Sequence, residues 1–235
     1  MLAGFDAVAA MGDGASDAGK AWVFVRRFVE GWAAPLEDRD GVSREALGAA
    51  GVPLPQVLGE MYRLIGRRDD LTRRQDFLLR PGECHWDETG EVLVFRRENQ
   101  SCAHWGIRRD DLRWADPPVV YQTGPTDRAW LPFLDRVSLA AVEMVLSESL
   151  FGTKHILSAG DLTADVLAGV LTRLRPLPFP EYPMWAGETV SPVRWYAAPG
   201  LLVRIDGPAP RAWLWAAGQC EEDLGLVSGV LPGYW

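Results

Sequence analysis

The stretch from Glu91 to Tyr121, EVLVFRRENQSCAHWGIRRDDLRWADPPVVY, decides the fold of this chain. It opens with a short, β-branched apolar run over 92–95, which predicts a buried strand. The polar run over 96–100 is too hydrophilic for a core and too short for a helix. Apolar and polar residues then alternate over 103–107, which is the pattern of a half-buried strand.

The end of the same stretch predicts a further strand. Asp116 and two prolines break the chain, and an apolar run begins at Val119, where a preceding proline is tolerated. Two or three antiparallel strands with a polar corner at Glu98, Asn99 and Gln100 are therefore expected.

Helices and further strands are expected on both sides of this stretch. Apolar residues at helical spacing follow capping residues and precede glycine or proline stops, and alternating runs between turn residues indicate strands. The expected helices cover 17–32, 43–50, 54–66, 139–151, a segment that Asp161 caps, and 221–230; the further strands cover 77–79, 193–197, 201–206 and 212–217.

The fold class expected from this order is α+β. N-terminal helices lead to a central antiparallel sheet with a packed helix, and C-terminal strands and a helix extend the domain. The expected divisions are an N-terminal helix and linker over 1–42, a core over 43–152 and a C-terminal extension over 153–235. The extension is expected to continue the central sheet, with a separate small domain as the alternative.

Several pieces of the chain, in this order and spacing, resemble the SUKH immunity-protein superfamily, which also contains fungal regulators of cell-wall synthesis. The resemblance covers roughly residues 43–152. It rests on Gly51-Val52-Pro53-Leu54-Pro55 with the helix after it, Phe95-Arg96-Arg97-Glu98-Asn99-Gln100, Trp105-Gly106, the double proline, and Trp130 and Phe133-Leu134 before a closing helix.

The resemblance implies a binding function without chemistry of its own. A bacterial protein of this kind is expected to neutralise a cognate toxin, of nuclease or deaminase type, by occluding its active site. A regulatory scaffold without a toxin partner is the alternative, and an uncharacterised enzyme comes third. The expected partner contacts lie at the polar corner, at Trp105 beside it, and in the charged loop that follows the alternating strand: Glu98, Gln100, Trp105, Asp110, Asp111, Trp114 and Asp116.

The net charge of −8 bears on the kind of partner. Residues 81–150 hold 12 acidic and 7 basic residues, so much of the acid excess lies in the central segment. This argues against nucleic-acid binding, which needs a basic surface, and it permits a basic protein partner. Simple solubility is the alternative explanation.

No enzyme motif is present. The sequence contains no phosphate loop, dinucleotide fingerprint, serine elbow or metalloprotease helix. Cys102 and His104 would share one face of a strand and could reach a metal, but Cys84 and His85 are adjacent and point to opposite faces. We therefore expect no bound metal and no cofactor. Glu143 falls beside the apolar stripe of its helix, where pairing with an arginine or an indole N–H is expected, with a catalytic acid as the alternative.

The cellular compartment is expected to be the cytoplasm. The three cysteines are odd in number and widely spaced, which is typical of free thiols in a reducing compartment. Neither a signal peptide nor an apolar run of membrane-spanning length is evident. Arginine outnumbers lysine 22 to 2, a bias that suggests a high-GC bacterial genome.

Overall fold

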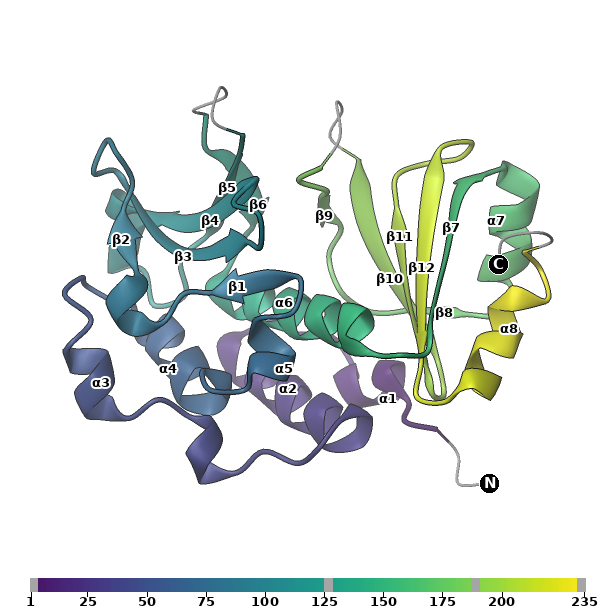
Figure 1. The fold of residues 1–235 in the computed structure, drawn as a ribbon, viewed down its shortest axis with the longest axis horizontal. Helices are drawn as coiled ribbons and strands as arrows, with labels where there is room; N and C mark the ends of the chain where they lie inside the picture. Colours follow the sequence, from purple (N-terminus) through teal and green to yellow (C-terminus); the bar gives the residue numbers. More distant parts are fainter. Residues whose placement is uncertain (1–3, 125–128, 187–190, 232–235) are drawn as a thin grey trace. The chain divides into compact units, whose positions relative to one another are not determined.

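The computed structural model describes residues 4–124, 129–186 and 191–231. Within these residues the chain forms helices and two six-stranded antiparallel sheets (Figure 1). The expected α+β class, with N-terminal helices, a central sheet with a packed helix, and C-terminal strands and helix, is confirmed. In the described part of the chain, no helix is both long enough and apolar enough to cross a membrane.

Contacts within the chain divide it into two compact units. The central unit comprises Asp17–Trp22 and Leu36–Ser149, and the terminal unit comprises Met1–Ser16, Val23–Pro35 and Leu150–Trp235. The predicted domain limits at residues 42 and 152 stay predictions.

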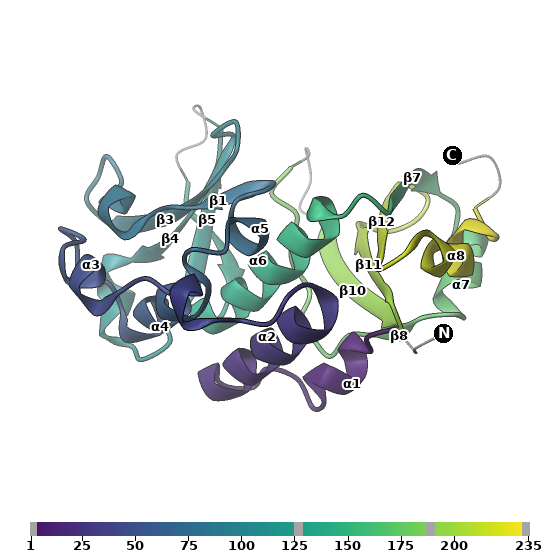
Figure 2. The ribbon, with the colours of Figure 1, turned by 60° about the horizontal axis from the view of Figure 1, so that its bottom comes forward.

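The central unit contains the first sheet, in the order β1-β3-β4-β5-β6, with β2 also pairing with β3. Figures 1 and 2 both show α4 and α6 on the same side of this sheet. The strands are β1 (Asp76–Leu78), β2 (His85–Trp86), β3 (Val92–Glu98), β4 (Ala103–Arg108), β5 (Val119–Thr123) and β6 (Leu131–Leu134). The helices are η1 (Asp38–Asp40), α3 (Arg44–Gly48), α4 (Gln56–Ile65), α5 (Asp69–Thr72), η2 (Pro81–Glu83), η3 (Arg109–Arg113) and the larger part of α6 (Val137–Gly152).

A β-bulge in β3 decides which side chains of this sheet face α6. Val94 pairs with Gly106 and Arg96 pairs with Trp105, so Phe95 has no partner in the register. Because two residues of β3 take the place of one, Arg96 joins Trp105 on the inner face instead of pointing outward. The expectation that the polar run from Arg96 is too hydrophilic for the core was wrong, since Arg96 is 1% exposed and Glu98 is 4% exposed.

Helix α6 is buried along almost its whole length, as its apolar circumference predicts. All residues from 137 to 150 are buried. The helix begins at Val137, two residues before the expected start at residue 139, and the carboxylate of Asp116 accepts the amide of Ser138 at 3.0 Å and its hydroxyl at 2.5 Å. A side chain from the preceding loop therefore caps the helix.

The terminal unit contains the second sheet, in the order β7-β12-β11-β10-β8, with β9 also pairing with β10. The expectation that the C-terminal strands continue the central sheet was wrong, because β10, β11 and β12 pair with one another and with β7, β8 and β9. The strands are β7 (Ile156–Leu162), β8 (Arg175–Pro176), β9 (Tyr182–Pro183), β10 (Pro192–Ala198), β11 (Leu201–Asp206) and β12 (Ala212–Gly218). The helices are α1 (Ala7–Met11), the larger part of α2 (Ala18–Trp32), α7 (Ala164–Leu171), η4 (Glu221–Leu224) and α8 (Gly225–Ser228).

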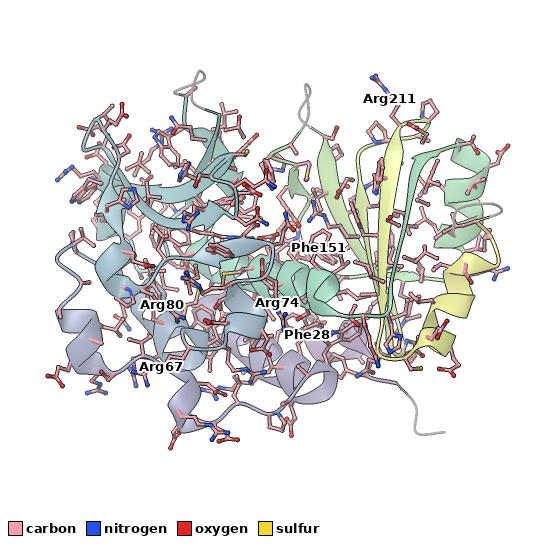
Figure 3. The ribbon with its side chains drawn as sticks, in the orientation of Figure 1. Phe28, Arg67, Arg74, Arg80, Phe151 and Arg211 are labelled. Carbon is pink, nitrogen blue, oxygen red and sulfur yellow. The ribbon has the colours of Figure 1, made fainter. Side chains whose placement is uncertain are left out.

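One face of the second sheet packs against α7 and α8. Ile205 and Leu214 of the sheet lie in one buried cluster with Val170 of α7 and Val227 of α8. Arg211, in the loop between β11 and β12, points away from the sheet (Figure 3). The two short helices therefore supply the apolar cover that this face of the sheet needs.

Two other expectations for this unit differ from the structure. The helix expected after Asp161 is instead capped by Thr163, whose hydroxyl accepts the amide of Val166 at 3.4 Å, and Asp161 lies in β7. The closing helix expected over 221–230 is divided into η4 and α8, which meet at Gly225, where a glycine weakens helix propagation.

Candidate functional site

A polar hollow lies on the outer face of the first sheet, on the side that does not face α6. In an antiparallel sheet, residues paired across strands share a face, and successive residues alternate between faces. Trp105 faces inward, so His104 and its partner Gln122 face outward. Gly106 also lies on the outer face, where a Cβ would come within 2.4 Å of Cγ1 of Val92. The glycine therefore lets β3 and β4 pack closely on this face.

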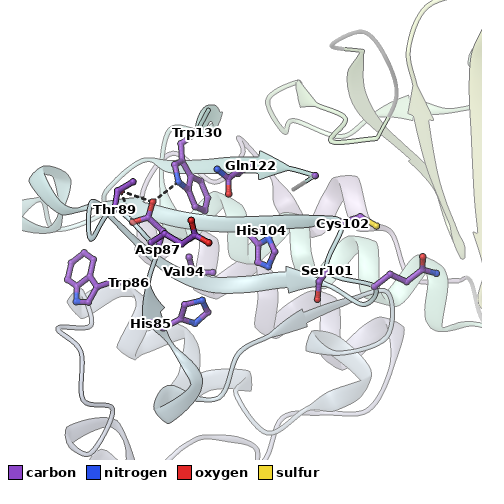
Figure 4. Close-up of a pocket in the computed structure, with 13 residues that line it drawn as sticks. His85, Trp86, Asp87, Thr89, Val94, Ser101, Cys102, His104, Gln122 and Trp130 are labelled. Carbon is purple, nitrogen blue, oxygen red and sulfur yellow. Dashed lines mark hydrogen bonds between the residues drawn. The ribbon is translucent and has the colours of Figure 1, made fainter. Parts of the chain in front are cut away.

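Three segments form the walls of the hollow: β2 with the turn after it, the turn between β3 and β4, and the residues on either side of the β5–β6 connection (Figure 4). Its volume is about 730 Å³. It is lined by His85, Trp86, Asp87, Glu88, Thr89, Val94, Gln100, Ser101, Cys102, His104, Gln122, Gly124 and Trp130. The described lining includes two carboxylates and no lysine or arginine.

Asp87 holds one wall in place. Its carboxylate accepts hydrogen bonds from the indole of Trp130 at 3.1 Å, from the Thr89 hydroxyl at 2.9 Å and from the Val92 amide at 3.0 Å. Partial burial opposes ionisation, but these donors together hold the pKa of Asp87 below its usual value. Asp87 is therefore a charged group that positions Trp130, and its carboxylate oxygens already accept hydrogen bonds from within the chain.

Two imidazoles contribute to the hollow from neighbouring elements (Figure 4). His104 is half-buried, and burial, followed by the nearby charges of His85 and Arg97, lowers its pKa. Nδ1 of His85 lies 2.9 Å from the carbonyl oxygen of Glu83. At neutral pH, His104 is consequently an uncharged group that can donate one hydrogen bond and accept another.

The cysteines do not form a metal centre with these histidines. Cys102 and His104 both line the hollow, as their spacing on one strand predicts. Cys84 is buried, and its sulfur lies 3.1 Å from the Tyr62 hydroxyl; burial raises the pKa of this thiol to about 11. Among the described residues, no group of three or more His, Cys, Asp or Glu side chains could hold a metal ion. The expected absence of bound zinc stays a prediction.

The structure separates the residues that were expected to contact a partner. Gln100 lies at the hollow, whereas Asp110, Asp111 and Trp114 lie at the opposite end of β4, in and after η3. Trp114 is 55% exposed. These residues therefore do not form one continuous patch around the polar corner.

Three residues that were expected to contact a partner, Glu98, Trp105 and Asp116, instead stabilise the fold of the chain itself. Trp105 is 1% exposed and Glu98 is 4% exposed, so neither side chain is available to a partner. The Glu98 carboxylate accepts the amides of Gln100 at 2.7 Å and Cys102 at 3.1 Å, which fastens the turn between β3 and β4. Asp116 caps α6. These assignments correct the predicted contact set.

Residues of the hollow that the sequence analysis did not select include Gln122 and Ser101. Gln122 follows the apolar run of its strand, and the alternation of Tyr121 with Gln122 was the signal that could have indicated an outward-facing polar side chain. Ser101 lies in a turn with a φ of 63°, which local pattern does not predict for serine.

A second group of titratable side chains is enclosed between β1, β3 and α6. Arg96 donates to Glu143 at 2.5 Å and to Asp76 at 2.6 Å, and its guanidinium lies 4.6 Å from the centre of the Trp105 ring. The expected pairing of Glu143 with an arginine is confirmed. Glu148 accepts the backbone amides of residues 74–76. This buried cluster joins the helix to the sheet.

Comparison of the chain with family models, curated proteins and solved structures finds no match.

Proposed function

We infer that the protein is a non-catalytic binding protein of the immunity type, which neutralises a cognate toxin by covering its active site. The resemblance of residues 43–152 to the SUKH superfamily motivates this proposal. The observation that carries it is the acidic, aromatic-walled hollow on the outer face of the first sheet, whose described lining contains Asp87, Glu88, Trp86 and Trp130 without a lysine or an arginine.

The chemistry of the hollow suits a basic partner segment. Two carboxylates attract a lysine or arginine side chain, and the Trp130 ring can pack against the aliphatic part of either. The Trp86 ring already contacts the guanidinium of Arg109, which lies 3.9 Å from its centre. Toxins that act on nucleic acid carry basic residues where the phosphate backbone binds. A hollow of this charge would therefore attract the surface that the toxin needs for its substrate and exclude that substrate.

The test uses substitutions at Gln122, which lies on the floor of the hollow. Gln122→Arg places a positive charge where the basic segment is expected, so association should slow and binding should weaken by about tenfold. Gln122→Glu has a similar size and adds a negative charge, and it should bind at least as tightly. Protection is measured by co-expression with candidate toxin domains sought among the genes that flank this one, and affinity by titration at several salt concentrations.

The exposed loop at η3 is the competing surface. Reversing Asp110 and Asp111 together to lysine should leave binding unchanged if the hollow is the contact. Loss of protection in this double variant, with full protection by Gln122→Arg, would move the contact to η3. Tight binding without protection would favour a regulatory scaffold.

A further inference from the structure

Strand β7 forms an open edge of the second sheet. It is the last strand in the order β7-β12-β11-β10-β8, and it pairs with β12 in the described part of the chain. Ile156 is 38% exposed, and Ser158 is exposed as well. An unpaired strand edge presents backbone donors and acceptors to any extended segment that can reach it.

The register shows which backbone groups point outward. The amide of Gly218 donates to the carbonyl of His155 at 2.9 Å, so the backbone of His155 faces the neighbouring strand. Alternate residues of a strand direct their N–H and C=O groups to opposite sides. Ile156 and Ser158 consequently direct theirs away from β12.

The other edge strands in the described residues are shorter or interrupted by proline. Pro132 lies in β6, Pro176 in β8 and Pro183 in β9, and β1 and β2 have three and two residues. A proline removes a donor from an edge and discourages pairing with another strand. Strand β7 has seven residues and no proline.

A groove of about 540 Å³ lies beside this edge. Its walls are the start of β7 and the η4–α8 segment, and its lining is Ile156, Leu157, Ser158, Glu221, Glu222, Leu224, Gly225 and Ser228. Glu221 and Glu222 are exposed. The groove therefore combines an apolar floor with negative charge at its rim.

We propose that β7 binds an extended, basic segment of another protein, which pairs with the strand as an additional antiparallel or parallel strand. Backbone hydrogen bonds to Ile156 and Ser158 supply binding, an apolar side chain enters the groove, and a lysine or arginine pairs with Glu221 or Glu222. A second copy of this chain fits less well, because its own Glu221 and Glu222 would add negative charge at the same edge. This site is independent of the hollow and of the proposed toxin contact.

The experiment uses the full chain and short synthetic peptides of alternating valine and threonine. One peptide carries lysine at both ends and the control carries glutamate. In both peptides the backbone amides that point to one side of the extended chain are N-methylated, so that the peptides can pair with one strand but cannot assemble into sheets. A third peptide, also with lysine at both ends, is N-methylated on the amides of both sides. We expect the lysine peptide to slow amide hydrogen exchange at Ile156 and Ser158, and the doubly methylated peptide to have no effect.

Matched variants distinguish backbone pairing from side-chain contact. Ser158→Pro removes an outward N–H and should weaken binding of the lysine peptide by about tenfold, whereas Ser158→Ala keeps the N–H and should bind like the original protein. Reversing Glu221 and Glu222 to lysine should transfer the preference to the glutamate peptide, which tests the site even if the proline variant does not fold.

Three results would overturn the proposal: no binding of the lysine peptide, binding that leaves the exchange at Ile156 and Ser158 unchanged, or a concentration-dependent dimer that protects these amides without peptide. Gln122→Arg should bind the peptide normally, so failure of the proposed toxin contact would not be mistaken for failure here.

Discussion

Glu148 illustrates how burial and hydrogen bonding compete at a single residue. Burial raises the pKa of its carboxyl group from 4.5 to about 7, although the charge of Arg96 and the amides of Asp76 and Arg74 oppose the change. Because the folded protein binds this proton more tightly than the unfolded chain does, the folded state takes up protons between these two pH values.

The stability of the protein should therefore depend on pH through Glu148. Its contribution is fully present below pH 4.5 and is lost as the pH rises to about 7, and the difference corresponds to about 3 kcal/mol in the free energy of unfolding. Urea unfolding at several pH values across this window measures the slope. Glu148→Gln should flatten it, and equal slopes in the two proteins would contradict the assignment.

In strand β3, neighbouring apolar residues face different surroundings: one side of the strand faces the core and the other faces the hollow. Leu93 pairs with Ile107 on the inner face, and Val94 pairs with Gly106 on the outer face beside the hollow. Leu93 is 0% exposed and Val94 is 2% exposed. The exposed fraction does not distinguish these two positions, but Leu93 faces the apolar core whereas Val94 faces the polar hollow.

Aspartate substitutions at these two positions should differ in cost. Leu93→Asp places a carboxylate in the apolar interior and should destabilise the fold by about 4 kcal/mol or more. Val94→Asp should cost less, because water in the hollow can reach the new carboxylate. Circular dichroism and thermal unfolding of both variants measure the difference. Equal destabilisation would show that the hollow gives no access to the Val94 side chain.

At the scale of the whole molecule, Phe5 and Asp6 contact segments that lie in the second half of the chain. The Phe5 amide donates to the Gln219 side chain at 2.8 Å, and the Gly200 amide donates to the Phe5 carbonyl at 2.9 Å. Arg175 pairs with Asp6 at 2.5 Å. The terminal unit therefore depends on chain segments that are far apart in sequence.

Deleting residues 1–16 should destabilise the terminal unit selectively. Native-state hydrogen exchange should become faster at Leu202 in β11, while Ile107 in β4 keeps its protection, because the lost contacts lie in the terminal unit. An Asp6→Asn variant, which retains α1 and weakens the ion pair, should have a smaller effect. Equal acceleration at both sites would indicate that the two units unfold together.

Local pattern by itself determined most helices and strands. The apolar run at Val92, the alternation around Trp105 and the apolar circumference of α6 each follow from side-chain period, which needs no knowledge of the rest of the fold. The pairing of Glu143 with an arginine also followed from the cost of burying a lone carboxylate. The family resemblance and the immunity function stay predictions.

Tertiary structure decided what depends on pairing between distant segments. The bulge at Phe95 turned Arg96 inward, and a register shift of one residue leaves no mark on a hydrophobicity pattern. The C-terminal strands form a second sheet, and whether such strands join an existing sheet or pair with one another likewise depends on tertiary structure. The hollow combines His85, His104 and Gln122 from three strands, and only the packing of those strands brings such separated side chains together.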